Sequence, residues 1–97
     1  DINLDTFTLW TDVLQYLGEF DTAIEILLEA CNVLPDEYEM EYRLAGLYFL
    51  TDDVTKGNLH LINGMKLEPK HLSLFQELFP VVWERTEVQK TIMKFKK

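Results

Sequence analysis

Apolar residues recur every three or four positions through most of this chain. This spacing places them on one face of an α-helix, whereas a half-buried strand alternates with a period of two, and no segment does so. We therefore predict an all-α fold with five to six helices and no sheet. The expected helices cover residues 6–17, 21–33, 37–51, 54–67, 72–79 and 86–97.

Polar residues stand in front of these segments, where a side-chain oxygen can accept a hydrogen bond from a free backbone N–H of the first turn. The expected N-caps are Asp5 or Thr6, Asp21, Asp53 and Thr86, while Asp36 with Glu39 resembles a capping box. Glycine and proline then end the segments. These stops are Gly18, Pro35, Pro69 and Pro80.

The first half of the chain repeats its pattern of large, small and helix-ending residues after 34 positions. A fixed period in this range is typical of arrays of supersecondary units, each too small to bury its own apolar face. The matched pairs are Trp10 with Leu44, Thr11 with Ala45, Leu14 with Tyr48, Phe20 with Val54, Ala23 with Gly57, Leu27 with Leu61, Ala30 with Gly64, Val33 with Leu67 and Pro35 with Pro69.

The second unit resembles the tetratricopeptide repeat. It reads Leu44-Ala45-x-x-Tyr48, then Gly57-x-x-x-Leu61, then Gly64 and Pro69. The resemblance implies a right-handed α-α superhelix in a single domain, residues 1–97. Its parts would be repeat one at 4–37, repeat two at 38–71, and a degenerate third helix pair at 72–97 that caps the array. Because the chain begins at Asp1 without a methionine, we expect a C-terminal fragment of a longer repeat protein.

Small residues carry this resemblance. A glycine inside a helix costs about 1 kcal/mol relative to alanine, and Gly57 and Gly64 lie seven residues apart on one helical face. Close approach of the partner helix is the cause that we infer. Replacing Gly64 with leucine should then be destabilising, whereas alanine, which stands at the equivalent Ala30, should be tolerated.

Charge is distributed unevenly along the chain, whose net charge is −8. Residues 1–42 hold eleven acidic residues and no lysine or arginine, whereas the remainder has nine basic residues against six acidic ones. A nucleic-acid partner is therefore not expected, because it requires a basic face. The basic cluster Lys90, Lys94, Lys96 and Lys97 is interpreted as a solvated helix end. An acidic surface instead favours a protein or peptide partner with basic residues.

No run of about 18 apolar residues spans a membrane and no leader is recognisable, so we expect no membrane partner and a cytoplasmic location. Cys31 is the only cysteine and is interpreted as ordinary packing, because neither His60 nor His71 stands in a pattern that links it to the thiol. His60 is expected on the outer face of its helix. Neither enzymatic activity nor a cofactor or metal is expected.

Acidic pairs four residues apart could suggest a metal site or an acid–base pair. Solvated helix faces carry the same pattern, and we favour that interpretation because unpaired charges are rarely buried. The pairs are Glu25 with Glu29 and Glu37 with Glu41.

The resemblance also implies where a partner would bind, since in this family the first helix of each unit lines the concave wall of the superhelix. The corresponding residues are Asp5, Thr8, Asp12, Gln15, Tyr16, Glu39, Tyr42, Arg43, Gly46, Phe49 and Leu50. Tyr42, Phe49 and Leu50 either form a docking surface or contact a neighbouring helix of the same array. The lysine and asparagine of the family's carboxylate clamp are replaced by Thr8 and Asp12, so binding of a terminal carboxylate is not expected.

The first segment has a second apolar row, which consists of Leu9, Val13 and Tyr16. A helix that packs on one partner does not require it. Either a preceding repeat or another copy of the chain could cover this row. The sequence thus favours a protein–protein interaction scaffold, and the alternative is an oligomerisation segment that pairs chains through the first helix, as a homodimer.

Overall fold

The computed structural model describes residues 3–96, and every regular element in that range is helical. The prediction of an all-α fold is confirmed for these residues, although there are seven α-helices rather than five to six. Lys97, which belongs to the expected basic cluster, lies outside the described residues. The elements are α1 (Leu4–Tyr16), α2 (Phe20–Val33), α3 (Tyr38–Leu50), α4 (Val54–Leu67), the 3-10 helix η1 (Pro69–His71), α5 (Leu72–Leu78), α6 (Pro80–Trp83) and α7 (Thr86–Lys96).

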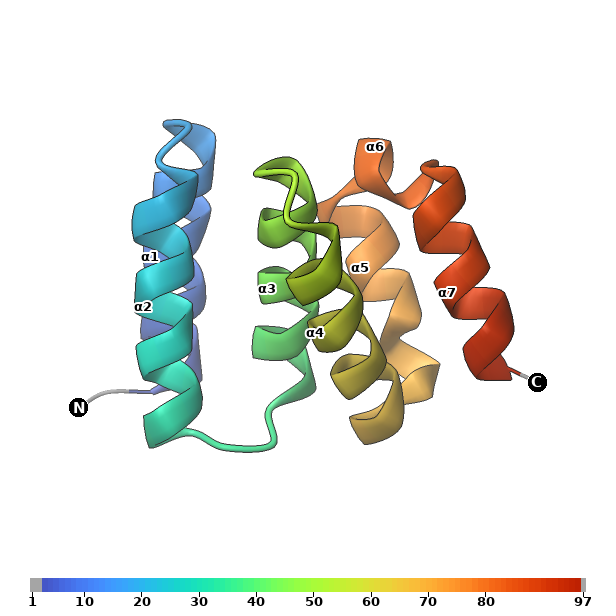
Figure 1. Ribbon diagram of the computed structural model, residues 1–97. Coiled ribbons are helices and arrows are strands. Elements are labelled where there is room, and N and C mark those ends of the chain that lie inside the picture. The colour runs from blue at the N-terminus through green and yellow to red at the C-terminus, as the bar shows by residue number, and fades with distance from the viewer. Residues whose placement is uncertain (1–2, 97) are drawn as a thin grey trace.

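The helices are arranged along an elongated molecule that measures 40 × 25 × 21 Å. Figure 1 shows α1 and α2 side by side at one end, α3 and α4 next to them, and α7 at the opposite end. Helix α2 packs on α3, α3 packs on α4 and α5, and α4 also contacts α7. None of the helices described for residues 3–96 is both long and apolar enough to cross a membrane.

The helix bounds recur with the period of the sequence. Helices α1 and α3 begin at 4 and 38 and end at 16 and 50, and α2 and α4 begin at 20 and 54 and end at 33 and 67. Each of these four offsets is 34 residues. The turns repeat as well, because Gly18 and Asp52 both adopt a left-handed backbone, with φ values of 79° and 64°.

The N-terminal caps follow the sequence only in part. Asp53 caps α4 as predicted, since its side chain accepts a hydrogen bond from Lys56 N at 3.2 Å. At α1 the cap is Asn3, whose side chain accepts from Thr6 N at 2.9 Å, so Asp5 and Thr6 lie inside the helix instead of capping it.

The capping box expected at residues 36–39 does not form. Asp36 has a φ of 62°, and α3 begins at Tyr38 after Glu37, which makes no side-chain capping bond. Similarly, Asp21 is already within α2, and Thr86 is the first helical residue of α7.

Helix α3 lies at the centre of the fold and is buried on nearly all sides. It contacts α2, α4, α5 and α6, and every residue from 42 to 49 is buried. The hydroxyl of Tyr42 donates a hydrogen bond to Glu68 O at 3.0 Å, which satisfies the polar end of a fully buried side chain. Burial, together with Glu68, raises the pKa of Tyr42 to about 12.

Two glycines let α4 lie close to α3. A Cβ added to Gly64 would lie 2.7 Å from the ring of Tyr42, and one added to Gly57 would lie 3.0 Å from the ring of Phe49. Carbon atoms prefer separations of about 3.5–4.0 Å, so neither position has room for a side chain as the helices stand. The prediction that these glycines permit close approach of the partner helix is confirmed.

We predict that Gly64→Ala lowers the free energy of unfolding by about 1 kcal/mol and Gly64→Leu by about 3 kcal/mol or more. Overpacking costs about 1–3 kcal/mol or more and opposes a gain of about 1 kcal/mol in helix propensity. The expectation from the sequence that alanine is tolerated is thus revised, because the ring of Tyr42 fills the space. Urea unfolding followed by circular dichroism measures both losses.

The control for this pair is Thr55→Ala, at an exposed position of the same helix, which should change stability by less than about 0.5 kcal/mol. A Gly64→Leu variant as stable as the parent would contradict the packing of α4 on α3.

Candidate functional site

The predicted wall residues of α1 lie at or near the surface. Thr8 and Gln15 are half-buried, and Asp5, Asp12 and Tyr16 are exposed. All five side chains lie on α1 and are at least partly accessible. Burial therefore does not prevent a partner from contacting them.

The predicted wall residues of α3 are mostly inaccessible. Tyr42 and Phe49 are completely buried, Arg43 is buried at 6% exposure, and Glu39 and Leu50 are half-buried. Of the two interpretations offered for Tyr42 and Phe49, contact with neighbouring helices is the one found. The C-terminal segment contributes to this burial, because the ring centroid of Phe75 on α5 lies 6.2 Å from that of Tyr42.

Gly46, also on the predicted wall, faces the C-terminal segment. A Cβ at this position would collide with the ring of Phe79, so the backbone of α3 lies directly against that ring. No partner can reach this part of the wall without displacing the C-terminal helices.

Arg43 forms two ion pairs, one of which joins the first helix pair to α3. Its Nη1 lies 2.5 Å from Asp12 Oδ1 on α1, and its Nε lies 3.3 Å from Glu39 Oε2 on α3. Because the guanidinium is buried, these carboxylates compensate its desolvation. Two of the acidic groups expected to attract a basic partner are therefore already neutralised within the chain.

A polar network centred on Glu41 connects α2, α3 and α4. His60 Nδ1 lies 2.8 Å from Glu41 Oε1, and Asn63 Nδ2 donates to the same oxygen at 3.1 Å. Cys31 Sγ is 3.7 Å from Glu41 Oε2, and the imidazole of His60 stacks on Tyr48 with ring centroids 5.4 Å apart. His60 therefore points between the helices, with its side chain 14% exposed, and the prediction that it lies on the outer face is wrong.

This network fixes the protonation of its acidic members. Burial alone raises the pKa of Glu41, but hydrogen bonds from His60 and Asn63 together with the charge of His60 outweigh burial and lower it. Burial and the adjacent Glu41 carboxylate raise the pKa of Cys31 to about 12. The thiol is thus protonated at neutral pH and is a poor nucleophile.

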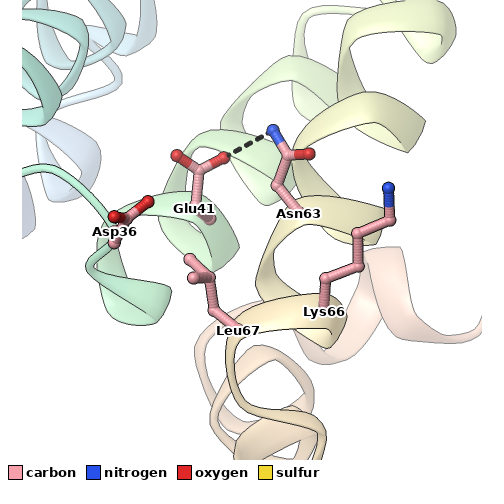
Figure 2. Close-up of a pocket in the computed structure, with 5 residues that line it drawn as sticks. All are labelled: Asp36, Glu41, Asn63, Lys66 and Leu67. Atoms are coloured by element: carbon pink, nitrogen blue, oxygen red, sulfur yellow. Dashed lines mark hydrogen bonds between the residues drawn. The ribbon is translucent and has the colours of Figure 1, made fainter.

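A cavity of about 300 Å³ opens beside this network. Figure 2 shows Glu41 of α3 hydrogen-bonded to Asn63 of α4, with Asp36 on the loop before α3 and Leu67 below Glu41 in this view. Lys66 completes the lining. Among residues 3–96, no three histidine, cysteine, aspartate or glutamate side chains are grouped so that they could hold a metal ion.

The two acidic pairs considered from the sequence lie in different environments in the structure. Glu25 and Glu29 are exposed on α2, which agrees with a solvated face. Glu41 instead turns into the network, away from a shared site with Glu37.

The largest unexpected feature is the apolar surface of α1. Leu9, Val13 and Tyr16 were predicted as an apolar row not required by the first helix pair, and Trp10 and Leu17 are exposed as well. We define these five residues as the outward face of α1, and their exposures are Leu9 68%, Trp10 54%, Val13 50%, Tyr16 90% and Leu17 65%. In α1 only Phe7 and Thr11 are buried.

The corresponding face of α3 is covered. Shifted by 34 positions, the outward face of α1 becomes Arg43, Leu44, Leu47, Leu50 and Thr51, of which the first three are buried and the last two half-buried. The first helix pair contributes to this cover, because α2 packs on α3 and Asp12 of α1 binds Arg43.

Comparison of this chain with protein-family models, curated proteins and solved structures found no match.

We predict that Glu41→Gln lowers the free energy of unfolding by about 1–3 kcal/mol near neutral pH, because it removes the charge that accepts the hydrogen bonds of His60, Asn63 and Cys31. The pKa of Glu41 is lowered in the folded state, so its stabilisation is present above the ordinary value of 4.5 and is lost as pH falls through the folded-state pKa. The difference between parent and variant should therefore shrink below pH 4.5.

Urea unfolding at a series of pH values measures this difference, and Glu25→Gln at an exposed position is the matched control. An equal pH dependence for the parent and the Glu41→Gln variant would show that the network does not hold the carboxylate in its charged form.

We also predict that Cys31 of the folded chain is alkylated slowly. Raising the pKa from 9.0 to about 12 lowers the thiolate fraction in mildly alkaline solution by on the order of a thousandfold. Iodoacetamide labelling followed by mass spectrometry compares the folded chain with the urea-unfolded chain, and Glu41→Gln should accelerate labelling of the folded form. Equal rates for folded and unfolded chains would contradict this protonation state.

Proposed function

We propose that this chain is a protein–protein interaction module and that the outward face of α1 is its docking surface. The observation that supports this proposal most strongly is the exposure of five large apolar side chains on one helix. Contiguous apolar surface of this kind commonly marks an interaction site, whereas single exposed apolar residues need no explanation.

We further propose that the chain is built as a tetratricopeptide-like array. The equal 34-residue offsets of the helix bounds and the close packing of α4 on α3 at Gly57 and Gly64 support this proposal. A binding wall on the inner side of such an array would retain Asp5, Thr8 and Gln15, whose side chains are accessible. Tyr42 and Phe49 of α3 could not contribute to this wall, because both are buried. We therefore favour the outward face of α1 over this wall.

The second candidate is an oligomerisation segment that pairs two chains through α1. The same apolar face favours it. Asp5 borders this face and residues 3–42 contain no lysine or arginine, so a symmetric contact between two copies of α1 brings like charges together. Analytical ultracentrifugation separates the candidates, because a strict monomer at high concentration removes the second.

We predict that the double variant Leu9→Ser/Val13→Ser loses partners that the parent chain retains in affinity capture. Leu9 is 68% exposed and Val13 is 50% exposed, so the substitutions should alter the surface with little change in the unfolding midpoint. Mass spectrometry of the proteins retained on the immobilised chain provides the measurement.

The matched control for this experiment is Val81→Ser on α6, whose side chain is 74% exposed at a distant apolar position. Partners lost by the double variant and kept by the control would support the outward face of α1. Identical retention by all three proteins would argue against it.

A further inference from the structure

The fold contains its own example of what covers a face like that of α1. Leu44 and Leu47 of α3 are the counterparts of Trp10 and Val13 at a distance of 34 residues, and they are 0% and 1% exposed. Helix α2 packs on α3 and contributes the buried Leu27 to the core that includes Leu44 and Leu47. The counterpart face is thus buried among helices, and a helix with apolar side chains at helical spacing is suited to cover the outward face of α1 in the same way.

The charge at the edge of α1 indicates a second property of the partner helix, its own charge. Asp5 lies four residues before Leu9, so its exposed carboxylate stands on the helix edge beside the outward face. No lysine or arginine occurs in residues 3–42 to neutralise this carboxylate from within the N-terminal helix pair. Asp12, four residues before Tyr16, is already paired with Arg43 of α3, so it adds little negative charge to this edge.

We propose that the outward face of α1 binds an amphipathic α-helix of another protein that carries lysine or arginine beside its apolar row. This inference rests on the proposed function and specifies the partner. The apolar row contacts Leu9, Val13 and the neighbouring exposed side chains, and the basic residues meet the carboxylate of Asp5 at the edge of the face, where they steer association and orient the helix.

A second copy of the chain fits this description less well. Its α1 is acidic at the same edge, and the outer positions of its basic helix α7 are mostly charged, with Met93 as the large apolar residue exposed there. The observations therefore favour a partner of different sequence, and self-association is an outcome that the experiment must detect.

Trp10 provides an intrinsic reporter of binding, because it belongs to the outward face and is 54% exposed. Replacing the half-buried Trp83 with phenylalanine leaves Trp10 as the only tryptophan in the chain. We would titrate this variant of the 97-residue chain with three synthetic peptides of about 20 residues, a length at which isolated helices become appreciably stable. One has leucines at helical spacing among lysines, the second has the same leucines among glutamates, and the third has the composition of the first with its leucines dispersed.

The expected result is a saturable blue shift of Trp10 emission with the leucine–lysine peptide. The leucine–glutamate peptide should bind more weakly by on the order of tenfold or more, because its charges oppose the acidic edge. The dispersed peptide should produce no saturable shift. Adding Leu9→Ser and Val13→Ser should abolish the shift, whereas the matched control Met93→Ser on α7, at a residue 64% exposed, should leave it unchanged.

Each other result overturns a defined part of the proposal. Equal binding of the lysine and glutamate peptides would refute the basic partner while leaving α1 as a docking surface. Self-association of the chain that is abolished by Val13→Ser would assign the face to a second copy. Absence of a saturable shift with both helical peptides would refute a helical partner, and a shift that persists in the Leu9→Ser/Val13→Ser variant would show that the proposed function, with this face as its site, is incorrect.

Discussion

The close contact between α3 and α4 is the constraint on which the rest of the structure depends. The rings of Tyr42 and Phe49 occupy the space that side chains would take at Gly64 and Gly57. Each glycine weakens α4 by about 1 kcal/mol, but burial of a large apolar side chain contributes about 1.5–3 kcal/mol, so the exchange favours the packed pair. With α4 this close, the hydroxyl of Tyr42 reaches the carbonyl of Glu68, and a buried polar group is satisfied.

Burial of α3 on nearly all sides also explains the polar network. A carboxylate on this central helix must be compensated, and Glu41 obtains its hydrogen bonds from Cys31 on α2 and from His60 and Asn63 on α4. Within residues 3–96 no buried side-chain nitrogen or oxygen lacks a partner. A fully satisfied network fixes the relative positions of three helices, and the same carboxylate that holds them keeps the Cys31 thiol protonated. Its chemistry is therefore that of a structural element.

Local signals in the sequence predicted the positions of the helices well, but they predicted poorly which helices pack against one another. The ends of α2 and α4 agree with expectation because glycine, proline and the Asp53 cap act within a few residues of themselves. The burial of Tyr42 and the inward position of His60 were missed, because both depend on helices far away in the sequence. The period of 34 residues located the close contact at Gly64, yet it could not show that the C-terminal helices would cover the wall of α3. That information lies in a third segment whose sequence no longer follows the repeat.

Helices α1 and α3 have the same length and the same place in the period, but their surroundings give them opposite roles. Covering Leu9, Trp10 and Tyr16 completely would contribute at most about 1.5–3 kcal/mol for each side chain, and part of each is already buried. Association itself costs about 4–15 kcal/mol, so the apolar face alone supports only weak binding. Additional stabilisation and discrimination between partners must come from the edge of the helix. There the exposed carboxylate of Asp5 has no basic neighbour within residues 3–42, and it favours a cationic side chain over an anionic one.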